Sequence, residues 1–135
     1  MKKEHAAYIA GIIDGEGSIS LVKVHKNQYP SPFISIPSSD LELLEWIKNT
    51  TGYGTIIRKR NYNPARHKDS YTLNIRYNEA ITLLNDIVEY LVLPRKKRRA
   101  MLIISEYKKV TPRNGRYSKE LLAEKERFYQ KFNSI

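Results

Sequence analysis

One order of predicted segments constrains the fold of this 135-residue chain more than any other feature: a helix followed by two strands, found twice. Apolar residues at near-helical spacing indicate the helices, and alternating β-branched residues indicate the strands. The segments are a helix over 5–13, strands over 18–25 and 29–37, a helix over 39–51, and strands over 55–60 and 71–77. This order predicts an α+β fold in which helices pack on one sheet.

Residues at the helix ends support these boundaries. Ser39 and Glu42 match a capping box, in which two side chains satisfy free N–H groups at the start of a helix. Asn78 is expected to cap a third helix, and Pro94 to open a fourth at a first-turn position. Ser118 is expected to cap a last helix after a linker over 111–117. The buried side of the helix after Pro94 is expected to contain Met101, Ile104 and Tyr107.

The strand over 71–77 predicts what the two faces of the sheet contact. One side of it carries Tyr71, Leu73 and Ile75, and the other carries Thr72, Asn74 and Arg76. We therefore expect one face to pack on helices and the other to stay open. A single domain over residues 1–135 is expected, with a core over about 5–107 and a C-terminal helix over about 118–132.

The charge of the chain indicates a polyanionic partner. There are 24 Lys and Arg residues against 14 Asp and Glu, a formal net charge of +10, and such a surface attracts nucleic acid. The lack of cysteine excludes disulfides and thiolate metal sites. No apolar run approaches the roughly 18 residues of a membrane span. The sequence therefore predicts an intracellular domain with no membrane association.

The segment Ile9–Gly17 contains the residues with the most chemical content. Ala10 and Gly11 lie within the predicted helix, where glycine costs about 1 kcal/mol relative to alanine, so we expect a partner helix to approach closely there. Asp14 and Glu16 follow the helix end, where carboxylates oppose the macrodipole. A bound cation offsets this cost, and Mg²⁺ binds one or two carboxylates together with phosphate oxygens. A core helix followed by an acidic turn without a metal is the alternative.

The sequence IAGIIDGEG at residues 9–17 resembles the LAGLIDADG motif of homing endonucleases. The segment order and the basic sheet also resemble the αββαββα fold of that family, loosely over about residues 5–107. The resemblance implies an α+β LAGLIDADG homing endonuclease fold with an antiparallel DNA-binding sheet and C-terminal helices. It also implies a site-specific DNA endonuclease that makes metal-dependent double-strand breaks at a long pseudo-palindromic target during intron or intein homing.

The resemblance implies roles for three residues of the motif. Glu16, the second acid, corresponds to the ligand of the catalytic divalent metal, and the backbone carbonyl of Gly15 assists it. Asp14, the first acid, is a lesser candidate ligand with a more structural part. The implied cofactor is Mg²⁺ or another divalent cation such as Mn²⁺, with Ca²⁺ as a non-catalytic substitute.

Two further catalytic positions follow from the same resemblance. Lys96 corresponds to the family's lysine at the start of the helix after the second strand pair, with Lys97 as the alternative. Arg98 and Arg99 replace the acidic and amide residues usual there, so the hydrogen bonds around the nucleophilic water are expected to differ. Ser38 is the nearest candidate for the polar residue that orders this water.

The chain contains one such motif, whereas single-chain members of the family contain two. One Glu16 is insufficient to cut two DNA strands, so we expect a symmetric homodimer whose motif helices pack together. The interface residues are expected to be Ala7, Ala10, Gly11 and Asp14.

Outward positions on the strands are the candidates for contacts with double-stranded DNA. They are Lys23, His25, Arg58, Arg60, Thr72, Asn74 and Arg76, and Lys97 joins them from the helix after Pro94. A register shift of one residue exchanges the two faces of a strand, so Val22, Val24 or Lys59 is the alternative. A metal role for His25 or His67 is disfavoured because neither lies in a ligand spacing.

Two other classes of protein fit a basic sheet. An RNA maturase or a non-catalytic nucleic-acid-binding protein of the same fold needs the sheet but not the acid. A basic structural protein of a ribonucleoprotein explains the charge but not the motif. The presence of Asp14, Glu16 and Lys96 favours the enzyme. A mitochondrion, a chloroplast and a prokaryotic cytoplasm are all compatible locations.

Overall fold

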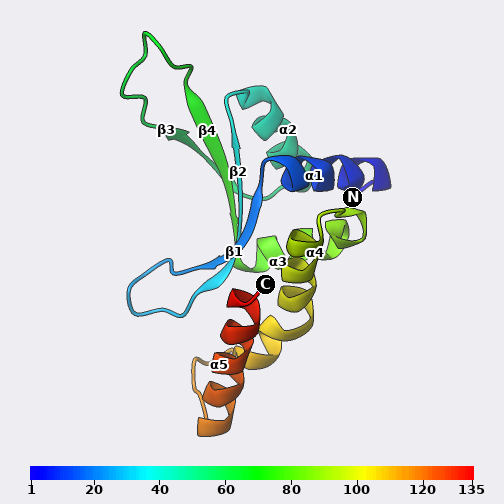
Figure 1. Ribbon diagram of the computed structural model, residues 1–135, viewed down its shortest axis with the longest axis vertical. Coiled ribbons are helices and arrows are strands. Elements are labelled where there is room, and N and C mark those ends of the chain that lie inside the picture. Colours follow the sequence, from blue (N-terminus) through cyan, green and yellow to red (C-terminus); the bar gives the residue numbers. More distant parts are fainter.

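The computed structural model describes residues 1–135 and contains two helix–strand–strand units followed by further helices (Figure 1). In chain order the elements are α1 (Lys3–Gly15), β1 (Ser18–Val22), β2 (Ser31–Ser38), α2 (Leu41–Thr51), β3 (Thr55–Lys59), β4 (Ser70–Arg76), α3 (Tyr77–Ile87), α4 (Pro94–Leu102) and α5 (Lys119–Asn133). Short helical turns occupy Val88–Tyr90, Ile103–Tyr107 and Lys108–Val110. The predicted αββαββα order with C-terminal helices is confirmed.

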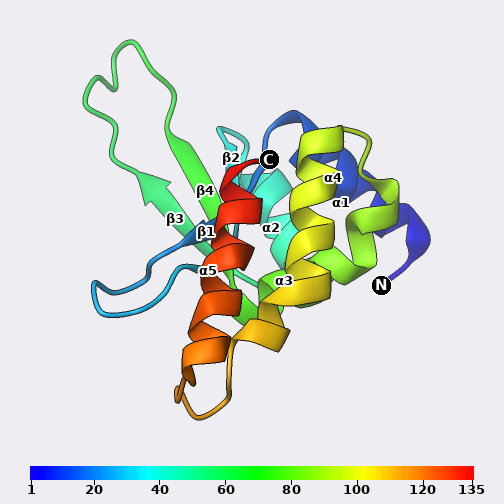
Figure 2. The same ribbon diagram turned by 60° about the horizontal axis from the view of Figure 1, so that its bottom comes forward.

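The four strands form one antiparallel sheet in the order β1-β2-β4-β3. In Figure 1 and Figure 2 the helices lie on one side of this sheet, and two long loops extend from the other. Ile34 pairs with Ile75 and Ile36 with Leu73, and all four side chains are buried. The alternation predicted for β4 is therefore confirmed, since its apolar positions belong to the core. The opposite positions, Thr72, Asn74 and Arg76, belong to the face that we call the open face.

One cluster of 23 buried apolar residues joins the sheet to the helices. It extends from Ile9 and Ile13 of α1 to Phe128 and Phe132 of α5. Helix α5 therefore packs in the same hydrophobic core as α1, the helix that contains the motif of residues 9–17. No helix has the length and apolar content needed to cross a lipid bilayer.

The first strand pair is shorter than predicted. Val22 pairs with Ser31 at the end of the ladder, so residues 23–30 form a loop, which we call the β1–β2 loop. Proline has no N–H for a ladder hydrogen bond, and Pro30 and Pro32 stand at this end of β2. The predicted strand positions of Lys23 and His25 are therefore wrong, because both residues lie in the β1–β2 loop.

Two of the four predicted caps are wrong. At α2 the hydroxyl oxygen of Ser38 accepts the N–H of Asp40 at 2.9 Å, and Ser39 makes no capping bond. Helix α3 begins at Tyr77, directly after β4, so Asn78 lies inside its first turn. Pro94 does open α4, and Ser118 does cap α5 by accepting the N–H of Leu121 at 3.1 Å.

The buried side of the chain after Pro94 agrees with the prediction at Tyr107 and differs from it by one position before that residue. Met101 is 54% exposed, and Ala100 and Ile103 are buried in place of Met101 and Ile104. The helix widens to a π-helical turn over Ile103–Tyr107, which adds a residue to that turn. Spacing counted at 3.6 residues per turn therefore fails here.

Candidate active site and nucleic-acid interface

The end of α1 is fixed by a glycine. Gly17 is buried, and a Cβ there would lie 3.0 Å from the Cα of Ile13 and 3.3 Å from the carbonyl oxygen of Ser35. Only glycine permits so close an approach between the turn and β2. Glu16 stands just before it as the C-cap of α1, and its N–H donates to the carbonyl of Ile12 at 2.8 Å. The motif therefore places Glu16 in a tight turn between α1 and β1.

Asp14 connects the end of α1 to the start of α4. Its carboxylate accepts the N–H of Val92 at 2.8 Å and the N–H of Leu93 at 3.3 Å, one on each oxygen. Hydrogen bonds from backbone N–H groups to a carboxylate are charge-assisted. This contact gives each oxygen a hydrogen bond inside the protomer, which is the structural part expected of Asp14, and its roles as a metal ligand and as a dimer contact stay predictions.

Lys96 makes the reciprocal contact. Its ammonium donates to the carbonyl oxygens of Ile13 and Asp14, each at 2.7 Å. Both carbonyls belong to the last turn of α1, where a cation complements the helix dipole, and that of Ile13 also accepts the N–H of Gly17 at 3.0 Å. The structure thus brings Lys96 to the turn that contains Glu16, as the resemblance implies for a catalytic pair. We call the four bonds of Asp14 and Lys96 the α1–α4 clamp.

Glu16 itself is exposed, and no protein group donates a hydrogen bond to its carboxylate. One or two carboxylates and several waters are the ligands that Mg²⁺ takes in proteins. The neighbouring Gly15 is exposed too, with no atom within 4 Å of where a Cβ would be. No group of three potential ligands gathers within one chain. The residues present therefore fit a hydrated divalent metal whose further ligands come from DNA or a second chain.

The other catalytic candidates have contacts of their own. Ser38 lies at the end of β2, on the helix side, and its hydroxyl is bonded to the N–H of Asp40. Lys97 is half-buried on α4, and its side chain makes no hydrogen bond. The catalytic role of Ser38 and the DNA role of Lys97 stay predictions.

Arg99 explains one departure from the family's pattern. Its guanidinium donates to the carbonyl of Ile19 at 3.2 Å and stands 5.1 Å from the ring centre of Phe132. Burial, followed by the charge of Arg95, lowers the pKa of Arg99. The arginine joins β1, α4 and α5, so its place in this sequence is structural.

The open face presents polar side chains over three strands. Ser35 of β2 lies between Ser18 and Asn74, and Pro37 lies beside Thr72. Arg76 stacks over the ring of Phe33 at 4.6 Å, which holds its guanidinium on this face by a cation–π contact. The predicted orientation of Thr72, Asn74 and Arg76 is confirmed, and their contacts with DNA stay predictions.

Strand β3 has the alternative register. Lys59 pairs with Ser70 on the open face, whereas Arg58 pairs with Tyr71 on the helix side. Arg58 also forms an ion pair with Asp69 at 2.8 Å. The outward position predicted for Arg58 is therefore wrong, and Lys59 takes its place.

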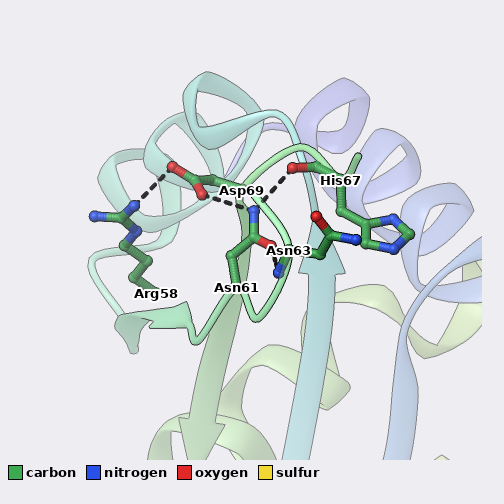
Figure 3. A network of polar contacts seen from close by, with 5 residues as sticks. All are labelled: Arg58, Asn61, Asn63, His67 and Asp69. Atoms are coloured by element: carbon green, nitrogen blue, oxygen red, sulfur yellow. Dashed lines mark hydrogen bonds and ion pairs between the residues drawn. The ribbon is translucent and has the colours of Figure 1, made fainter. Parts of the chain in front are cut away.

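A network of polar contacts shapes the loop between β3 and β4 (Figure 3). The amide of Asn61 donates to the carbonyl of His67 at 2.8 Å and to the carboxylate of Asp69 at 3.2 Å. Its side-chain oxygen accepts the N–H of Asn63 at 3.0 Å. Beside this network, the guanidinium of Arg60 lies 5.0 Å from the ring centre of Tyr62. The loop carries exposed cations on a defined backbone.

The predicted dimer residues divide between two faces of α1. Ala10 is fully buried in its own protomer, so its role as a dimer contact is wrong. Ala7 and Gly11 are exposed one turn apart, and a Cβ on Gly11 would have no atom within 4 Å. Tyr8 beside them is 56% exposed. Nothing inside the protomer requires glycine at position 11.

An exposed carboxylate and a lysine at the end of α1, next to an open sheet with cationic loops, fit a nucleic-acid hydrolase. The sequence model of the LAGLIDADG endonuclease family matches residues 9–107, which span the motif helix, the sheet and α4. The chain belongs to this family, and it is a site-specific DNA endonuclease that uses a divalent metal. No curated protein sequence matches the chain significantly.

Solved structures agree on the fold. The homing endonuclease I-CvuI, in complex with its target in the presence of calcium, matches with a TM-score of 0.63 and 23% identity, over 79% of this chain and 68% of that one. The archaeal intron-encoded I-Vdi141I in complex with DNA matches with a TM-score of 0.58 and 20% identity, over 96% and 99% of the two chains. The meganuclease I-SmaMI bound to uncleaveable DNA matches with a TM-score of 0.54 and 25% identity, over 97% of this chain but 41% of that one.

Proposed function

We propose that two copies of this chain cleave both strands of a long pseudo-palindromic DNA target, with Mg²⁺ as the divalent metal. The observation that carries the proposal is the free Glu16 carboxylate beside the α1–α4 clamp, present once per chain. Each strand of the target needs one such site. A symmetric dimer supplies two of them and presents two open faces, one to each half of the target.

The exposed side of α1 supports this dimer. Ala7 and Gly11 leave room for a second helix to approach closely, and small residues favour such packing. The lengths of the relatives agree, since this chain spans less than half of I-SmaMI and nearly all of I-Vdi141I. Two copies of this chain therefore match the length of the larger enzymes.

In the proposed reaction Glu16 and the Gly15 carbonyl hold the metal near the scissile phosphate. The metal, when bound, activates water and stabilises the charge that grows on the phosphate oxygens. Lys96 adds a fixed positive charge at the same turn, because two carbonyls hold its ammonium in place. The open face lies in the major groove, which admits β-strands, and the cations of its loops bind phosphates.

Replacement of the Glu16 carboxylate tests this function. The Glu16→Gln variant is expected to bind DNA that carries the uninserted host site but to cut it at least ~100-fold more slowly, since one metal ligand is lost. The same change at the exposed Glu45 of α2 is the matched control and should cut normally. Cleavage is measured on gels with Mg²⁺, and binding by gel shift with Ca²⁺. Equal cutting by the parent and Glu16→Gln contradicts the proposed site.

A further inference from the structure

A cavity of about 620 Å³ lies between the β1–β2 loop, the start of α3 and the linker over 111–117. We call it the C-terminal pocket. The side chains of His25, Arg76, Arg113 and Lys125 line it, and no acidic residue does. A cavity with two arginines, a lysine and no carboxylate favours an anion.

The C-terminal pocket continues the open face beyond the end of the sheet. Ser31 and Arg76 both line it. In the ladder Ser31 pairs with Val22, and Arg76 pairs with Phe33, so both belong to the open face. The pocket therefore lies next to the surface on which we propose that a duplex binds.

Lys125 forms the base of the pocket without an anionic partner. The residue is only 2% exposed, and its ammonium donates to the hydroxyl of Thr111 at 2.9 Å and to the carbonyl of Val110 at 3.3 Å. Burial lowers the pKa of Lys125 to about 8. Because no carboxylate neutralises this charge, it contributes to the field inside the pocket.

Four tyrosine rings surround the ammonium of Lys125. The distances from its nitrogen to the ring centres are 5.2, 5.2, 5.3 and 5.6 Å for Tyr29, Tyr107, Tyr117 and Tyr129. These residues come from the β1–β2 loop, the turn after α4, the linker and α5. Cation–π contacts thus join four separate segments at one point. The hydroxyl of Tyr129 also donates to the carbonyl of Pro30 at 3.0 Å, which ties α5 to the β1–β2 loop.

The rim of the pocket holds a strained residue. Tyr77 lines the pocket and has a φ of 51°, the one positive value outside glycine. Its ring is 40% exposed and stands edge-on to Tyr107 at 5.8 Å. Left-handed backbone in a bulky residue costs on the order of 1 kcal/mol and is concentrated at functional sites.

We propose that the C-terminal pocket binds a backbone phosphate of the DNA duplex that lies on the open face. Arg113 from the linker and Arg76 from β4 contact the phosphate, and Lys125 with its tyrosines holds the walls in place. This inference rests on the proposed function, since it names an additional contact for the same DNA. The linker and α5 thereby extend the DNA-binding surface beyond the four strands.

Substitution of Arg113 tests the pocket. Arg113 is exposed on the linker, so Arg113→Gln should keep the native near-ultraviolet circular dichroism spectrum. Its affinity for a random-sequence DNA duplex should fall about three- to tenfold in dilute salt. The slope of log affinity against log salt should become shallower by about 0.9, the value for one lost phosphate contact.

The matched control is Arg127→Gln, which removes the same charge from an exposed site on α5 that lies near Glu106 and Glu124. This variant should bind DNA with the parent's affinity and salt slope. A salt slope of Arg113→Gln equal to that of the parent, or an equal loss of affinity in both variants, overturns the proposed phosphate site. As long as the parent binds the duplex, neither result contradicts the proposed function. Failure of the parent to bind the duplex overturns both.

Discussion

At the scale of single residues, the α1–α4 clamp is the arrangement on which the site depends most. Asp14 and Lys96 each satisfy backbone groups at the other's helix end, with 2.7–3.3 Å between donor and acceptor. Helix ends otherwise leave such groups to water. The clamp therefore fixes the turn of Glu16 relative to α4, although neither side chain needs to touch the metal.

Removal of the Asp14 carboxylate should weaken both stability and cleavage. Asp14→Ala leaves two N–H groups before α4 without acceptors, a loss of about 1–2 kcal/mol by analogy with a lost cap. Urea unfolding monitored by circular dichroism measures the stability, and the initial rate of DNA cutting measures activity. Asp86→Ala is the control, because Asp86 is exposed on α3 and makes no side-chain hydrogen bond. A parent-like midpoint for Asp14→Ala would show that the clamp contributes nothing.

The sequence gives Glu16 and Lys96 their candidate roles only through resemblance to a family, and the structure then shows that Lys96 reaches the last turn of α1. The sequence around either side of the clamp does not indicate the contact with the other, because 78–83 positions separate the partners of the clamp. The contacts of Asp14 could not be predicted from the sequence either. Its position in the motif suggests a metal ligand, and only the tertiary structure shows that both of its oxygens accept backbone N–H groups just before α4.

At the scale of elements, the sequence predicts the helices and strands that have a clear apolar period, but it does not predict the residues at which they begin and end. Alternation in β4 identifies its buried face, and Leu73 and Ile75 pair there with Ile36 and Ile34 of β2. The sequence of β3 has no such alternation, since the neighbouring residues Ile56 and Ile57 place apolar side chains on both faces. The predicted face of Arg58 is therefore wrong. The cap at Asn78 is wrong because β4 runs directly into α3, and the cap at Ser39 is wrong because α2 begins one residue later, with Asp40 as its N-cap.

The tyrosine-lined site of Lys125 makes the stability of the C-terminal element depend on pH. The pKa of Lys125 is lowered to about 8 from an ordinary value of 10.5. Between these values the unfolded chain binds more protons than the folded one, so this group's contribution to stability increases as pH rises. Below pH 8 both states carry the charge, and above 10.5 neither does. Burial raises the pKa of Tyr107 and Tyr129, so their contribution falls once pH exceeds about 10.

We therefore predict different pH profiles for the parent and Lys125→Met. From pH 8 to pH 10 the free energy of unfolding of the parent should rise relative to that of the variant. The difference in slope should stay below ~1.4 kcal/mol per pH unit, the limit for one proton. Urea unfolding in a series of buffers measures it, with Lys119→Met at an exposed position of α5 as the control. Parallel profiles for the parent and Lys125→Met would contradict an ionised, buried Lys125.

At the scale of the whole molecule, the proposed function depends on the assembly of two copies. One chain offers a single Glu16 and no complete set of metal ligands. The exposed Ala7 and Gly11 of α1 are the surface where a second copy is proposed to pack. Their burial pattern follows directly from helix periodicity, which assigns Ala10 to the core and Gly11 to the surface.

A bulky charge at position 11 should separate the copies without unfolding either. Space around Gly11 is open, so Gly11→Glu keeps the protomer fold and gains helix propensity. Two glutamates facing each other at a dimer axis repel, and the variant should sediment as a monomer that no longer makes double-strand breaks. Ala123→Glu on the exposed side of α5 is the control. A Gly11→Glu protein that stays dimeric and active excludes this helix face as the interface.

The open face shares no side chain with the α1–α4 clamp: Thr72, Asn74 and Arg76 come from β4, whereas Asp14 and Lys96 join two helices. Substitutions of these three β4 residues are therefore expected to change DNA recognition and to leave the clamp intact. The residues proposed to read the DNA and those proposed to support its cleavage can then change independently. The same separation offers protein engineers a surface for retargeting that does not require rebuilding the reaction centre.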